Sequence, residues 1–248
     1  MPPSTKLQGE FDIRCEWGVE GLRRVAISCK AIIIVDVLSF CTAVDIAVAG
    51  GATVYPYRYK DETAIAFAAQ QDAVLAERDR RVGGFSLSPE SLILIPRGTR
   101  LVLPSPNGSS LAATAAEAET DTPVFAACLR NAAAVARAAE RFGAPICVVP
   151  AGETWDNQSL RPALEDFIGA GAVINHLRGN LSLEAEAAWT CFERFKDMLL
   201  ETLNVCSSGK ELNERGCSLD VELAAALNTS ACVPVLQNGA FVDLLTVH

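Results

Sequence analysis

The stretch from Ala31 to Gly51, AIIIVDVLSFCTAVDIAVAGG, decides the expected fold. Its first five residues are apolar, which is typical of a strand that is buried on both faces. The strand ends at Asp36, and a segment of helical composition follows and closes at two glycines. A buried strand that leads directly into a helix is the repeating unit of an α/β protein.

The same alternation continues further along the chain. Strand-like segments recur at 52–57, 99–104, 123–128 and 144–150, and helical segments separate most of them. Strands separated by helices of about ten to fifteen residues favour a sheet with helices on both faces. We therefore expect a three-layer α/β/α sandwich with a largely parallel or mixed central sheet.

Helical patterns dominate from about residue 153 onward. The segments 159–177 and 182–203 each begin with a capping-type serine and are predicted to be helices. An earlier helix is expected over 61–80, with Glu77 and Arg78 near its end. Because no segment has the composition of a linker, we expect a single domain over residues 1–248.

Composition excludes several classes of function. The net charge of −9 is unsuited to a nucleic-acid surface, which needs a basic stripe. No apolar run reaches the ~18 residues of a membrane span, and no signal pattern opens the sequence. Nine scattered cysteines without a CxxC pair, and only two histidines, argue against a disulfide framework or a zinc site. We expect a cytoplasmic protein that binds neither nucleic acid nor membrane.

Polar residues follow four of the predicted strands, in IIIVDVLSFCT, LVLPSPNGSS, VFAACLRN and ICVVPAGETWDN. In open α/β sheets, ligands bind in the crevice outside the carboxyl ends of the strands. We therefore expect these four strand ends to converge on one site.

Three short segments carry the candidate chemistry, and each has two interpretations. Asp36 is either a capping or turn aspartate, or a metal ligand or nucleophile at the edge of the sheet. Asn107 and Gly108 form a common turn, but N–H groups at the start of the next helix can also hold a phosphate or sulfonate. Glu165 and Asp166 are ordinary acids of a first helical turn, or oxygen ligands suited to Mg²⁺.

These segments, in their order and spacing, resemble the 2-phosphosulfolactate phosphatase family from about Cys15 to Val242. The segments that carry the resemblance are VDVLSFCTAV, AERDRRVGGFSLSP, PNGS, LRNAAAVA, PAGE followed by LRPALEDFIGAGAVI, and SGKELNERGCSLDVELAAALNTSACVPVL. The resemblance implies an α/β/α fold and a Mg²⁺-dependent hydrolase that removes phosphate from 2-phospho-3-sulfolactate, a step towards coenzyme M. The expected substrate is this compound or a related small anionic phosphate ester.

The resemblance also implies roles for particular residues. The expected catalytic residues are Asp36, Glu77 and Asn107, and the expected metal ligands are Asp36, Glu165 and Asp166. The expected substrate-binding residues are Thr42, Arg78, Gly108 and Asn131. Ser39 and Ser109 are expected to bind substrate as well, because of their positions after predicted strand ends.

One departure from the family supports an alternative function. Ser39 stands where the characterised enzymes resembled here carry an arginine, which is a natural ligand for phosphate or sulfonate. The alternative is a non-catalytic protein that binds a phosphorylated or sulfonated metabolite. A nucleotide-binding enzyme is a third option, although GxGxxG and Walker signatures are missing. The apolar face of 182–203 can pack internally, which is the default, or across a homodimer.

Overall fold

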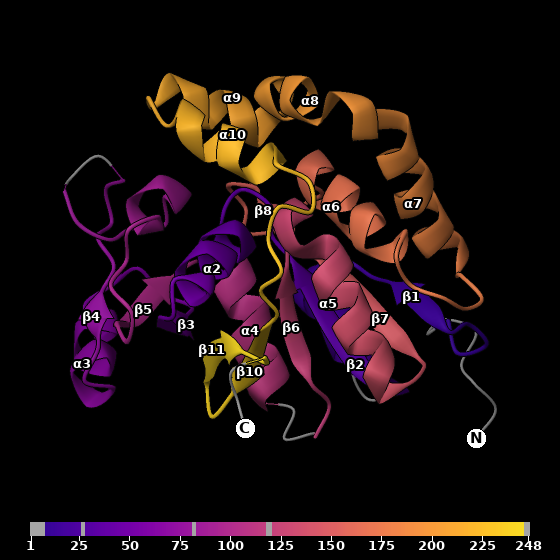
Figure 1. Ribbon diagram of the computed structural model, residues 1–248, viewed down its shortest axis with the longest axis horizontal. Helices are drawn as coiled ribbons and strands as arrows, with labels where there is room; N and C mark the ends of the chain where they lie inside the picture. Colours follow the sequence, from indigo (N-terminus) through magenta and orange to yellow (C-terminus); the bar gives the residue numbers. More distant parts are fainter. Residues whose placement is uncertain (1–7, 26–27, 81–82, 118–120, 246–248) are drawn as a thin grey trace.

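The computed structural model describes residues 8–25, 28–80, 83–117 and 121–245. A nine-stranded sheet in the order β1-β7-β2-β6-β10-β11-β3-β5-β4 forms its centre (Figure 1). The strands are β1 (Ile13–Cys15), β2 (Ala31–Val35), β3 (Thr53–Tyr57), β4 (Val74–Leu75), β5 (Arg100–Pro104), β6 (Val124–Ala127), β7 (Ile146–Pro150), β10 (Pro234–Gln237) and β11 (Ala240–Asp243).

The sheet is mixed. Strands β1, β7, β2 and β6 form one parallel block, and β3, β5 and β4 form another. The antiparallel hairpin of β10 and β11 joins the two blocks, because β10 pairs with β6 and β11 pairs with β3. Asn238 and Gly239 turn the hairpin with positive φ angles of 49° and 78°, which is the chemistry of a two-residue turn.

Helices cover both faces of the sheet, which confirms the predicted sandwich. On one face lie α1 (Gly18–Val25), α2 (Phe40–Ala49) and α4 (Gly108–Glu117). On the other lie α5 (Ala132–Ala139), α6 (Leu164–Ile174) and α7 (Leu183–Phe195), with α3 (Thr63–Gln70) nearer the β4 edge. Strand β2 serves both cores, because Ile32 and Ile34 enter the first while Ile33 and Val35 enter the second.

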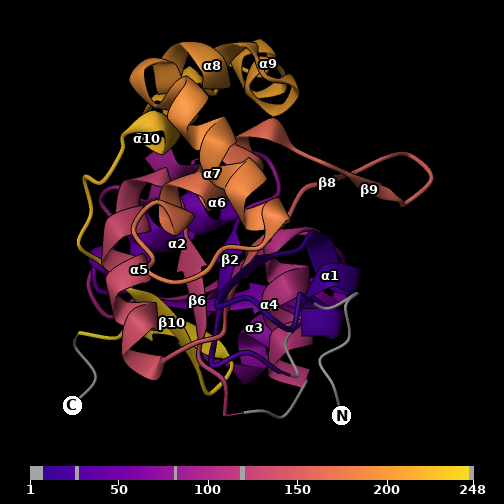
Figure 2. The ribbon, with the colours of Figure 1, turned by 90° about the vertical axis from the view of Figure 1, so that its right-hand side faces the viewer.

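Three short helices, α8 (Leu199–Val205), α9 (Ser207–Glu214) and α10 (Ser218–Ala225), lie together beyond one end of the central strands (Figures 1 and 2). A small hairpin of β8 (Glu153–Thr154) and β9 (Leu160–Arg161) projects sideways from the same region (Figure 2). Across the described ranges, no helix combines the length and the apolar character that crossing a membrane requires.

Three predicted helices have different boundaries. The helix expected over 61–80 ends at Gln70, because Asp72 adopts a positive φ of 47° and the chain then enters β4. Glu77 and Arg78 therefore lie in a loop after a strand. The helix expected from residue 159 begins only at Leu164, since 160–161 pair in the β8–β9 hairpin.

The long helix expected over 182–203 is divided. Ser182 caps α7, as its type predicts, by accepting a hydrogen bond from the Ala185 N–H at 3.1 Å. The helix is interrupted at Lys196–Met198 and resumes as α8. Its apolar face is divided too, because Phe192 and Leu199 are buried whereas Met198 is partly exposed. The homodimer stays a prediction.

The two glycines within α6 are explained by close packing. A Cβ at Gly169 would lie 2.6 Å from Val37 Cγ2, at the end of β2. A Cβ at Gly171 would overlap the Ala188 carbonyl group of α7 and lie 2.7 Å from the Phe192 Cβ. Helix α6 therefore approaches both the sheet and α7 more closely than any larger residue would permit.

We expect Gly171→Ala to destabilise the protein, although helix propensity alone would make it stabilising by about 1 kcal/mol. Overpacking against the α7 backbone should cost about 1–3 kcal/mol and reverse that sign. Urea unfolding measures the difference. Gly83→Ala is the control, because nothing lies within 4 Å of a Cβ there. A more stable Gly171→Ala protein would contradict the observed packing.

Candidate active site

A polar cavity of about 220 Å³ opens where three strand ends meet helix α9. The segment after β2 contributes Asp36 and Ser39, the segment after β5 contributes Asn107, and the start of β8, after β7, contributes Glu153. The fourth predicted strand end, after β6, does not contribute. There the fully buried Asn131 accepts the Cys128 N–H and holds the turn into α5.

Asp36 is fixed by backbone N–H groups from two helices. Its Oδ1 accepts the Phe40 N–H of α2 at 3.0 Å, and its Oδ2 accepts the Gly108 N–H of α4 at 2.9 Å. A Cβ at Gly108 would lie 2.7 Å from Oδ2, so glycine is what permits this approach. The strand-end aspartate is thus both a cap for two helices and a wall of the cavity.

The environment of Asp36 shifts its protonation. Only 4% of the residue is exposed, and burial raises its pKa to about 6, with Glu165 adding to the rise. The two N–H donors and the Arg80 guanidinium oppose that rise in pKa. A carboxyl group with such a pKa can exchange protons near neutral pH, as a general acid or base must.

Asp166, in the first turn of α6, also accepts hydrogen bonds from two backbone N–H groups. Its Oδ1 accepts the Val37 N–H at 2.7 Å, and its Oδ2 accepts the Gly152 N–H at 2.9 Å. It therefore ties the end of β2 to the end of β7. Burial, followed by the charges of Asp36 and Glu165, raises the pKa of Asp166 well above its usual range. Glu165 and Asp166 are both buried, and neither is among the residues that line the cavity.

Asn107 and Glu153 form a second polar wall. Asn107 donates from Nδ2 to Glu153 Oε2 at 2.8 Å, and its Oδ1 accepts from Thr154 Oγ1 at 3.2 Å. Burial and the nearby Asp36 raise the pKa of Glu153 to about 7. The cavity therefore holds two acids that titrate close to neutrality.

Cations complete the cavity, together with helices α9 and α10, which we call the helical cap. Lys60 and Arg80 come from loops, and Arg215 comes from the end of α9. Partial burial and the charge of Arg80 lower the pKa of Lys60. Ser39 accepts hydrogen bonds from both Nη atoms of Arg80, each at 3.1 Å.

The remaining predicted residues lie elsewhere. Glu77 and Arg78 border a much smaller neighbouring cavity, which shares Lys60 and Leu87 with the first. Thr42 and Ser109 are buried and donate to backbone carbonyl groups, of Val37 at 2.8 Å and Leu103 at 3.0 Å. Their side chains hold the loops in place and do not line the cavity.

Sequence reasoning missed several cavity residues. Arg80 stands two positions after Arg78, and nothing in the string ERDRR tells the two apart. Lys60 and Arg215 have no motif of their own. Glu153 has a signal, since it follows the predicted strand 144–150, but the residue roles expected from the sequence do not include it.

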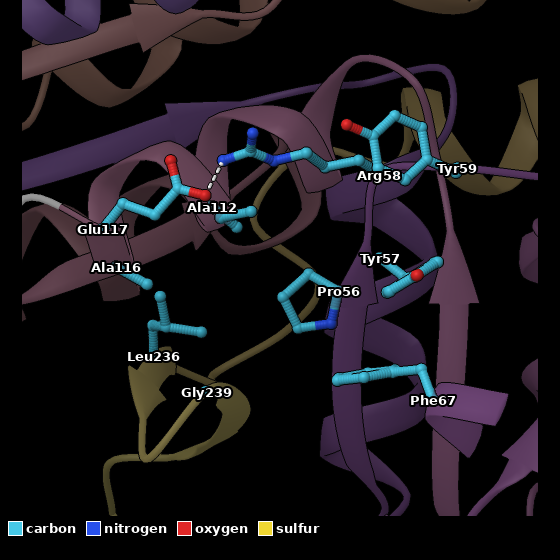
Figure 3. A pocket seen from close by; sticks show the side chains of 11 residues that line it. Pro56, Tyr57, Arg58, Tyr59, Phe67, Ala112, Ala116, Glu117, Leu236 and Gly239 are labelled. Carbon is cyan, nitrogen blue, oxygen red and sulfur yellow. Dashed lines mark ion pairs between the residues drawn. The ribbon is translucent and has the colours of Figure 1, made fainter. Parts of the chain in front are cut away.

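A larger cavity of about 360 Å³ lies away from these residues, between the end of β3, α4 and the β10–β11 turn (Figure 3). Its walls are mainly apolar and aromatic, and Tyr57 stacks on Phe67 with 4.7 Å between ring centroids. Its charged side chains, Arg58 and Glu117, pair with each other at 2.6 Å. The polar cavity has the better chemistry for a reaction, because its carboxyl groups are buried and shifted in pKa.

Fold and cavity together define the class: an α/β protein with an acid-and-cation site at the strand ends. A relative from Carboxydothermus hydrogenoformans, named probable 2-phosphosulfolactate phosphatase, is 32% identical over 86% of this chain and 90% of its own. One with the same name from Thermosynechococcus vestitus is 29% identical over 82% and 87%. The 2-phosphosulfolactate phosphatase of Methanothermobacter thermautotrophicus is 29% identical over 58% of each chain.

The family model for 2-phosphosulpholactate phosphatase matches residues 20–239. The chain belongs to this family. The resemblance predicted from the sequence is therefore confirmed, and so is the class of enzyme, a phosphoric monoester hydrolase.

We expect Glu153→Gln to flatten the dependence of stability on pH. Because the folded pKa of about 7 lies above the ordinary 4.5, the folded state binds more protons than the unfolded chain between these values. The contribution of Glu153 to stability is full below about pH 4.5 and is lost as pH rises through 7. Glutamine keeps the acceptor for Asn107 but does not titrate.

Urea unfolding at pH 5 and pH 8 measures this effect. The free energy of unfolding of Glu153→Gln minus that of the wild type should be larger at pH 8 than at pH 5. Asp36 keeps part of the slope, since burial raises its pKa in the same direction. Glu186→Gln, on the exposed side of α7, is the control. If the free energies of unfolding of the wild type and Glu153→Gln changed equally between pH 5 and pH 8, the raised pKa of Glu153 would be wrong.

Proposed function

We propose that the protein is a Mg²⁺-dependent phosphatase that hydrolyses 2-phospho-3-sulfolactate, or a related small anionic phosphate ester, to the alcohol and phosphate. The observation that carries the proposal is Asp36, a buried carboxyl group at the cavity wall with both oxygens aimed by backbone N–H groups. The names of the relatives supply the substrate. The family resemblance implies, and we also propose, a role on the route to coenzyme M.

The residues of the cavity divide the work between them. Asp36 acts at the phosphoryl group, as metal ligand, as base toward water or as nucleophile, and its fixed carboxylate loses little freedom on doing so. Arg80 and Lys60 offset the charge of an anionic ester. Asn107 holds Glu153, whose pKa of about 7 suits proton transfer to the leaving alcohol.

The donor chemistry of the cavity fits Mg²⁺. Asp36 and Glu153 present carboxylate oxygens to the cavity. The charge of Asp36 raises the pKa of Glu153, and the charge of Glu165 raises the pKa of both, a repulsion that a bound cation would relieve. Within the described ranges, no three acidic, histidine or cysteine side chains form a ready cage. Mg²⁺ needs none, because it commonly binds one or two carboxylates, water and substrate phosphate. When bound, the ion would neutralise charge on the transferring phosphoryl group.

Binding without turnover is the alternative function, and Ser39 is the residue that favours it. Ser39 favours it because the family arginine is missing there. The structure also holds an observation against it: Ser39 accepts hydrogen bonds from Arg80, so a guanidinium still lies close to this position. Thermal stabilisation by phosphosulfolactate without release of phosphate would establish the alternative.

We expect Asp36→Asn to lower kcat for phosphosulfolactate at least 100-fold, the usual size of a general acid–base contribution. Phosphate release with Mg²⁺ is the measurement, and circular dichroism confirms folding. Asp45→Asn is the control, because Asp45 is equally buried and bonded to Arg130 and Ser230 outside the cavity. Near-normal turnover of folded Asp36→Asn would remove this residue from the mechanism.

Mg²⁺ should raise the melting temperature more at pH 8 than at pH 5, because protons compete with the ion for Asp36 and Glu153. Differential scanning calorimetry of wild type and Glu153→Gln measures the shift. The variant should lose most of it, while Glu186→Gln should keep it. A shift that is independent of pH and of Glu153 would place the ion elsewhere.

A further inference from the structure

Arg80 is held rigidly at the cavity by the helical cap. Its Nη1 donates to Asp220 Oδ2 of α10 at 2.8 Å, and its side chain is only 15% exposed. Asp220 is itself fully buried, and its Oδ1 accepts from the Ser88 hydroxyl and the Glu90 N–H. Both oxygens of the Asp220 carboxylate therefore accept hydrogen bonds, and these contacts fix the position of the Arg80 guanidinium.

The guanidinium retains donors for a ligand. Ser39 Oγ accepts from both Nη1 and Nη2. Among the described residues, the hydrogen bonds to Asp220 and Ser39 use three of the five N–H donors that an arginine carries. A planar guanidinium fixed in this way can still bind an anionic group with oriented hydrogen bonds.

Helix α9 brings a second group to the same cavity. Ser208, in its first turn, lines the cavity and is 6% exposed. Its Oγ is buried without a hydrogen-bond partner among the residues that the structure describes. A buried hydroxyl without a partner has lost its hydrogen bonds to water, so an acceptor oxygen in the cavity would remove that desolvation penalty.

We propose that Arg80 and Ser208 form a subsite for the non-reacting sulfonate of the substrate, and that they thereby set specificity for sulfonated phosphate esters. The inference rests on the proposed function. A sulfonate has three acceptor oxygens and a permanent charge, which suits a fixed guanidinium together with a hydroxyl. Arg215 also lines the cavity, but it lies 3.6 Å from Glu211, a second lining residue, so this pair adds no net charge and Arg80 is the cation of the subsite.

A purely structural role of Arg80, linking the cap to the sheet, predicts something different. It would lower activity toward every ester alike, because the whole cavity would be disturbed. Arg130 offers a matched comparison, since its side chain is 17% exposed and pairs with the fully buried Asp45 at 2.9 Å, outside the cavity.

The test compares kcat/KM for 2-phosphosulfolactate and for 2-phospholactate, which lacks the sulfonate. We expect Arg80→Lys to reduce the ratio of the two values about tenfold and Ser208→Ala to reduce it several-fold, mainly through KM for the sulfonated ester. Arg130→Lys should leave the ratio as in the wild type. Equal losses for both esters in Arg80→Lys would overturn the proposal.

Calorimetric binding of 3-sulfolactate and lactate separates this inference from the proposed function. If the wild type hydrolyses neither ester, the proposed phosphatase activity fails, but the subsite still predicts that 3-sulfolactate binds more tightly than lactate. Arg80→Lys should abolish that preference. Equal binding of the two acids by the wild type would overturn the subsite whatever the activity.

Discussion

Two buried carboxylates at the end of β2 hold the carboxyl-end region together. Asp36 accepts N–H groups from the first turns of α2 and α4, and Asp166 accepts N–H groups that follow β2 and β7. These four hydrogen bonds satisfy backbone donors that would otherwise be buried without partners. They also fix where the cavity walls stand, since Asn107 and Glu153 lie next to the donors.

The cost of this arrangement is electrostatic. Burial and mutual repulsion raise the pKa values of Asp36, Glu153 and Asp166. The same acids would repel an anionic ester, and positive charges on the cavity wall offset that repulsion. Lys60 and Arg80 provide them, and Arg80 is bonded to Asp220 of α10. The buried acids and the cations of the cavity thus come from different segments of the chain.

The β2–α2 unit could be predicted from sequence because its signals are local. An apolar run, a strand-end aspartate and a helical segment occur within twenty-one residues, and the structure places Asp36 at the cavity as the pattern suggests. The β10–β11 turn also has a local signal, Asn238-Gly239, which is a dipeptide typical of a two-residue hairpin turn.

The partners of the site could not be predicted, because they depend on contacts between distant residues. Asp166 bonds Val37 across 129 positions, and Arg80 bonds Asp220 across 140. No periodicity in the sequence encodes such pairs. Thr42 and Ser109 illustrate the opposite problem, since a hydroxyl beside a ligand and a hydroxyl that stabilises a loop have the same sequence signature.

The β10–β11 hairpin has a consequence for the order of assembly. It occupies the middle of the sheet, between β6 and β3, yet it follows both of them by more than a hundred positions in the chain. Until residues 234–243 arrive, β6 and β3 are open edges that can pair with other chains. Helices α2 and α4 contact both parallel blocks and can hold them together during synthesis, but the sheet becomes continuous only when this last hairpin pairs with both inner edges.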